Sequence, residues 1–107
     1  MKKIEAIILP SQLHSVRSEL ERRGISAALT LTEVQQRAND KVSVSGGKEM
    51  SGPLEVRVKV ELLVADRQVP KVMGIILQYA QVATKKIVGH VALLRVSEVL
   101  QMVPPLR

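Results

Sequence analysis

Charged and apolar side chains alternate in one stretch of the sequence, and these charged residues are the first candidates for chemistry. Glu55, Arg57, Lys59 and Glu61 occupy every second position between 54 and 62. Because successive side chains of a β-strand point to opposite faces, all four would share one face of a sheet. Two interpretations are open: cross-strand ion pairs on a solvated face, or a polar site for a charged ligand.

Other reactive residue types are few. The chain has no Cys, which excludes disulfides, thiolate metal sites and cysteine nucleophiles. Of its two histidines, His14 lies beside Ser15 in a helical pattern, where we expect it to be exposed, and His90 follows a basic connector at 84–89. We therefore expect no catalytic residue and no metal site.

Composition narrows the class of protein further. The net charge of +6 and the sequence pI of about 10.1 invite a nucleic-acid interpretation. However, the basic residues are scattered among acids, and the only aromatic residue is Tyr79, so binding of bases by stacking is disfavoured. The N-terminus does not resemble a signal peptide and no apolar run is long enough to cross a membrane, so we expect a cytoplasmic protein.

Hydrophobic periodicity predicts one domain over residues 1–107. The pattern of residues 54–62 is the clearest strand, and two amphipathic segments, one capped by Ser11 and one with Pro70 in its first turn, are typical of helices. A polar segment at 36–53, rich in Gly and Ser, predicts a long protruding loop. The predicted elements are strands at 3–9, 25–34, 54–62 and 91–96, and helices at 11–24 and from Asp66 or Gln68 to Ala80.

This order, βαββαβ, predicts an α+β fold of the ferredoxin-like type, with a four-stranded antiparallel sheet and two helices on one face. The opposite face of the sheet would mix apolar and charged side chains. Since a half-apolar face is unfavourable in water, we expect an oligomer that packs its sheets together.

Several segments resemble the PII signal-transduction family. The opening Met1 to Ile8, followed by Pro10, Leu13, Val16-Arg17, Leu20 and Gly24-Ile25, matches the start of PII proteins almost position for position. Residues 30–34 resemble the TVTEV strand, residues 58–61 the VKIE strand, and residues 96–100 the last strand and turn of the family. The resemblance covers residues 1–100.

The resemblance implies a homotrimer that binds adenine nucleotide in clefts between subunits and contacts a transporter or enzyme through the loop at 36–53, the T-loop. It implies partner-binding residues in this loop at Arg37, Lys48, Glu49 and Met50. The nucleotide-binding residues that it implies are Ile7, Leu29, Thr30, Arg57, Glu61, Val64, Lys86, Gly89 and His90.

Departures from the family pattern bear on the choice of ligand. The phosphate loop, GKIGDGK in the family, is replaced here by residues 85–90, and the two arginines that grip the outer phosphates correspond to Gln101 and Val103. Fewer cations leave a triphosphate poorly neutralised, so ADP or AMP is expected in preference to ATP. Met50 replaces the tyrosine that is uridylylated in the family.

Three function classes remain open from the sequence. The first is a nucleotide-responsive regulator, which includes divergent, carboxysome-associated members that respond to bicarbonate; a cationic pair of Arg57 with His90 or Lys86 would suit that anion. The second is a small enzyme of the acylphosphatase kind, for which Asn39 is a poor catalytic candidate. The third is a structural or RNA-binding ferredoxin-like module without nucleotide sensing, although an RNA-binding sheet needs aromatic residues.

Overall fold

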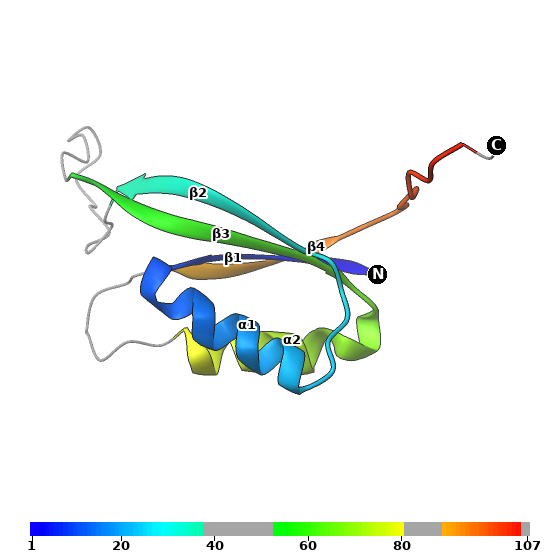
Figure 1. The fold of residues 1–107 in the computed structure, drawn as a ribbon, viewed down its shortest axis with the longest axis horizontal. Helices are drawn as coiled ribbons and strands as arrows, with labels where there is room; N and C mark the ends of the chain where they lie inside the picture. Colours follow the sequence, from blue (N-terminus) through cyan, green and yellow to red (C-terminus); the bar gives the residue numbers. More distant parts are fainter. Residues whose placement is uncertain (38–52, 81–88, 106–107) are drawn as a thin grey trace, which may run out of the picture.

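A four-stranded antiparallel sheet packed on two helices makes up the computed structural model, which describes residues 1–37, 53–80 and 89–105. The strand order is β2-β3-β1-β4 (Figure 1). This arrangement confirms the predicted ferredoxin-like fold. The elements are β1 (Lys2–Ile8), a 3-10 turn η1 (Pro10–Gln12), α1 (Leu13–Arg22), β2 (Leu29–Arg37), β3 (Leu54–Val64), a 3-10 turn η2 (Asp66–Gln68), α2 (Val69–Tyr79) and β4 (His90–Arg95).

Some element ends differ from the predictions. Ser11 lies within η1 and does not cap α1, whose N-cap is Gln12. Residues 25–28 are a connection and not part of β2, because Gly24 ends the helix with φ of +74° and the chain must first cross back to the sheet. At the other end, β2 continues through Gln36 and Arg37, which were assigned to the loop. Residues 38–52 lie outside the described part of the chain.

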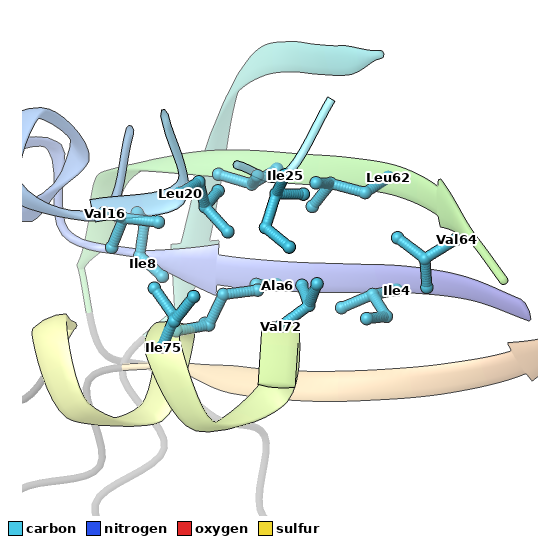
Figure 2. Packing of buried hydrophobic residues seen from close by; sticks show 12 residues of the cluster. Ile4, Ala6, Ile8, Val16, Leu20, Ile25, Leu62, Val64, Val72 and Ile75 are labelled. Atoms are coloured by element: carbon cyan, nitrogen blue, oxygen red, sulfur yellow. The ribbon is translucent and has the colours of Figure 1, made fainter. Parts of the chain in front are cut away.

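The core lies between the sheet and the two helices (Figure 2). Alternate residues of β1 and β3 point toward the helices, and α1 contributes Val16 and Leu20 at i,i+4 spacing. In α2 the buried side includes Ile75, whereas Leu77 is exposed. The buried hydrophobic residues are Ile4, Ala6, Ile8, Val16, Leu20, Ile25, Val60, Leu62, Val64, Val72, Ile75 and Ile76.

The remaining face of the sheet, which we call the open face, lies on the side away from both helices (Figure 1). In the part of the chain that the structure describes, no helix packs against it. None of the helices in these ranges is long and apolar enough to span a membrane.

Candidate functional site

Alternation along β1 and β3 places the charged side chains together on the open face. In β1 the residues that face away from the core are Lys3, Glu5 and Ile7, because Ile4, Ala6 and Ile8 are buried in it. The strand register sets Glu5 opposite Glu61 and Ile7 opposite Lys59. Glu61 is also opposite Thr30 of β2.

These charges form a connected group of ion pairs. Lys3 Nζ lies 2.6 Å from a carboxylate oxygen of Glu61 and 3.0 Å from one of Glu5, and Lys59 Nζ lies 3.9 Å from Glu5. The hydrogen bond from Lys3 lowers the pKa of Glu61, and the same bond raises the pKa of Lys3. Of the two sequence-based interpretations, cross-strand ion pairing therefore holds for Lys59 and Glu61. The central cation, Lys3, was missed by the sequence prediction.

A cavity opens beside this group. Its volume is about 430 Å³, and both Thr30 and Glu61, two of the predicted nucleotide-binding residues, line it. The walls combine aliphatic side chains with two carboxylates, one ammonium and one hydroxyl, a combination suited to a small ligand with polar donors. The lining residues are Lys3, Ala28, Thr30, Glu61, Leu62, Leu63, Val96, Glu98 and Val99.

A second set of predicted residues lies further along the sheet. His90 is opposite Ile7 in the β1–β4 pair, and Gly89 precedes it. A Cβ atom on Gly89 would lie 1.9 Å from the carbonyl oxygen of Ile7, so only glycine allows this approach of the two backbones. Three predicted residues, Ile7, Gly89 and His90, are thus brought together at one end of β1.

Arg57 has a different environment from the other charged residues of β3. Its side chain is buried, with 7% of the residue exposed. The guanidinium donates hydrogen bonds to a carboxylate oxygen of Glu55 at 2.7 Å and to the carbonyl oxygen of Val56 at 2.9 Å. Since these bonds use part of its donor set, Arg57 is held in one orientation by its own strand.

Two of the predicted residues face the helices and not the open face. Val64 is 2% exposed and belongs to the core, whereas its neighbour Leu63 is 40% exposed and lines the cavity. The reason is the alternation of the strand: a shift of one residue moves a side chain to the opposite face. Leu29 is opposite Leu62 and lines a smaller hollow of about 100 Å³ beside α1, so it too faces the helices.

Comparisons with known proteins identify the family of this chain. The family model described as "Nitrogen regulatory protein P-II" matches residues 1–103. The chain belongs to the P-II family. The Nitrogen regulatory protein P-II of Pasteurella multocida is 39% identical over 83 residues, which cover 76% of this chain and 73% of the relative. The protein of the same name from Haemophilus influenzae is 37% identical over 83 residues, with the same shares of the two chains.

Membership of the P-II family makes the protein a regulatory signalling protein. Of the positions carried over from the family, Lys48, Glu49, Met50 and Lys86 lie outside the described residues. Arg37 is exposed at the last position of β2, opposite Leu54.

The two positions where the resemblance implies arginine in the family lie beyond β4. Gln101 and Val103 are both exposed in the segment after that strand, and Val103 is 76% exposed. This segment runs away from the sheet toward the C-terminus (Figure 1).

The histidine on the first helix does not line the cavity. His14 is exposed, as predicted, and its ring nitrogen lies 3.5 Å from the hydroxyl of Ser18. Within residues 1–37, 53–80 and 89–105, no group of three or more His, Cys, Asp or Glu side chains is arranged to hold a metal ion.

Proposed function

We propose that the protein is a cytoplasmic regulator that binds an adenine nucleotide, ADP or AMP in preference to ATP, between the subunits of a homotrimer. In this proposal the bound nucleotide controls a partner transporter or enzyme through the segment between β2 and β3. The support comes from the family and from the positions of the candidate residues on the open face.

The observation that carries the proposal is the separation of these residues into two groups. Thr30 and Glu61 line the cavity, while Gly89 and His90 lie at the other end of β1. From Thr30 on β2 to His90 on β4 the sheet is three strand spacings wide, about 14 Å. A ligand that contacted both groups on one subunit would lie on a flat face exposed to solvent. A second copy of the chain is therefore needed to enclose it.

Exposed apolar residues also favour association of copies. Beyond β4, Leu100 is 82% exposed and Met102 is 100% exposed. On the open face Leu63 and Leu94 are also exposed. Because a stable monomer seldom presents so much apolar surface, burial between copies is the physical expectation. Sedimentation equilibrium at micromolar protein should show a trimer, and a monomer alone at that concentration would contradict this part of the proposal.

Preference for the shorter nucleotides rests on charge. A third phosphate needs cations close to it, and the uncharged Gln101 and Val103 supply none at the positions where the family has arginine. Calorimetric titration with AMP, ADP and ATP should therefore give ADP or AMP an affinity at least equal to that of ATP. Binding of ATP at least tenfold tighter than ADP would refute the preference.

A matched pair of variants locates the ligand. Thr30→Val removes a hydroxyl from the cavity wall, whereas Thr32→Val makes the same change two residues along β2, opposite Lys59 and outside the cavity lining. Only Thr30→Val should weaken ADP binding. Each titration is repeated with bicarbonate. If the protein is a bicarbonate-responsive member of the P-II family, this anion should tighten the binding of ADP or AMP. Equal losses in both variants would place the nucleotide elsewhere.

A further inference from the structure

Two carboxylates lie directly opposite each other at the centre of the open face. Glu5 of β1 and Glu61 of β3 are register partners in the antiparallel pair. Like charges at directly opposed positions repel, and this arrangement destabilises a sheet unless a cation lies between them. Lys3 provides that cation, with its Nζ 3.0 Å from Glu5 and 2.6 Å from Glu61.

We propose that Lys3 is a positioning residue for the cavity: it holds the Glu61 carboxylate in place and ionised, so that Glu61 accepts hydrogen bonds from hydroxyl or amino donors of the ligand. This inference rests on the proposed function, because it takes the cavity as the place where part of a nucleotide binds. Lys3 acts through Glu61, although its own side chain also lies in the cavity wall.

The burial of these groups makes the interaction effective. Side-chain exposure is 33% for Lys3, 20% for Glu61 and 24% for Glu5, so all three are partly sheltered from water. Screening by solvent and salt is weaker there than on an open surface. The short bond from Lys3 is also the largest cause of the lowered pKa of Glu61.

Among the described residues, the charges around Glu61 make Lys3 its main cationic partner. β1 presents Lys3 and Glu5, β2 presents the uncharged Thr30, and the segment after β4 brings Glu98 to the same cavity. On β3 itself, Lys59 lowers the pKa of Glu61 only through a longer-range interaction, and its ammonium is paired with Glu5. Without Lys3, Glu61 would therefore face two carboxylates, and its pKa should rise.

Lys2 offers a matched control. It is the neighbouring residue on the same strand and carries the same charge, but its Nζ pairs with the exposed Asp66 at 3.3 Å, and it does not line the cavity. Lys2→Met thus removes one positive charge and leaves Glu61 untouched. Lys3→Met removes the same charge from the cavity.

The test is calorimetric titration of ADP into the full chain and its variants Lys3→Met, Lys3→Arg and Lys2→Met, at about pH 6, 7 and 8. Loss of a charge-assisted contact predicts that Lys3→Met weakens ADP binding about tenfold at pH 7, with a larger loss at lower pH. Lys2→Met should stay within about twofold of the wild type, and Lys3→Arg should recover most of the affinity. Carbon-13 NMR titration of the Glu61 carboxyl group should show a raised pKa in Lys3→Met alone.

The outcomes separate this inference from the proposed function. If wild type binds ADP and Lys3→Met binds it equally well at all three pH values, the role of Lys3 is refuted while the proposed function stands. If wild type binds no adenine nucleotide, the proposed function fails and this inference fails with it. Circular dichroism checks that Lys3→Met is folded. If it is not, Lys3→Gln, which removes the charge but keeps a polar side chain, replaces it, and a loss of less than about twofold refutes the inference.

Discussion

Gly89 approaches β1 more closely than any residue with a side chain could, so Gly89→Ala tests the backbone geometry at that end of the open face. The added Cβ would lie 1.9 Å from the Ile7 carbonyl oxygen and 3.0 Å from its carbonyl carbon, whereas ordinary contacts begin at 3.4 Å. To relieve the overlap, the start of β4 must move away from β1 by the difference between 3.4 and 1.9 Å, about 1.5 Å. A movement of that size disrupts the pairing of Ile7 with His90.

The expected cost follows from two contributions. Overpacking typically destabilises by about 1–3 kcal/mol, and weakening of a strand hydrogen bond adds about 1 kcal/mol. A loss of about 2–4 kcal/mol should lower the Tm by at least about 8 °C in a domain of this size. Thermal unfolding followed by circular dichroism measures the shift, at one fixed protein concentration because oligomers unfold in a concentration-dependent way.

Gly74→Ala is the matched control, because Gly74 lies inside α2 and a Cβ there meets no atom within 4 Å. The same substitution should stabilise the helix by about 1 kcal/mol. The two variants should therefore move the Tm in opposite directions. If Gly89→Ala melts within about 2 °C of the wild type, the close approach to Ile7 is incorrect and the argument for this end of the site collapses with it.

Three further outcomes can be measured. Ile76 is fully buried, so Ile76→Ala should cost about 2–5 kcal/mol in urea unfolding, and a loss below about 1 kcal/mol would contradict the core described above. The hydrogen bond from Arg22 lowers the pKa of Glu19 to about 2, so the stability that Glu19 contributes is present above about pH 5 and lost as the pH falls toward about 2. Glu19→Gln should flatten that part of the stability–pH curve, and an unchanged slope would exclude this ion pair as its cause. Gln101→Arg combined with Val103→Arg should strengthen binding of ATP more than of ADP in calorimetry, and equal gains would show that these positions do not meet the outer phosphate.

Strict local periodicity made much of the fold predictable. In β3, apolar and charged residues alternate from Leu54 to Leu62, and this alternation alone assigns its two faces. Pro70 lies in the first turn of α2, where proline is common, and so indicated the start of the second helix. The order of strands and helices then restricts the arrangement to a few topologies, of which the ferredoxin-like one was correct.

Features that depend on contacts between distant segments were not predictable. Gln36 and Arg37 have the polar character of a loop, yet they extend β2 because β3 supplies partners for them in Glu55 and Leu54. The ion pairs of Lys3 were missed because they depend on the register that sets Glu5 opposite Glu61, which no pattern within β1 reveals.

The direction of the Val64 side chain also follows from strand alternation. One position along a strand exchanges the core face for the open face. Val64 is buried and Leu63 is exposed, so Leu63 presents its side chain on the open face. Periodicity within β3 indicates the same, since the run of Val60, Leu62 and Val64 has the spacing of a buried face.

The distribution of charge on the open face favours one orientation of the proposed nucleotide. At the cavity end, the carboxylates of Glu5, Glu61 and Glu98 outnumber the ammonium groups of Lys3 and Lys59, so this end disfavours a phosphate and suits hydrogen-bond donors of a sugar or base. At the other end, Gly89 leaves the backbone bare beside His90. A nucleotide bound as proposed would place its base and sugar in the cavity and its phosphates toward Gly89 of the second copy. On this proposal the number of phosphates would depend on nearby cations, and the exposed Gln101 and Val103 supply none.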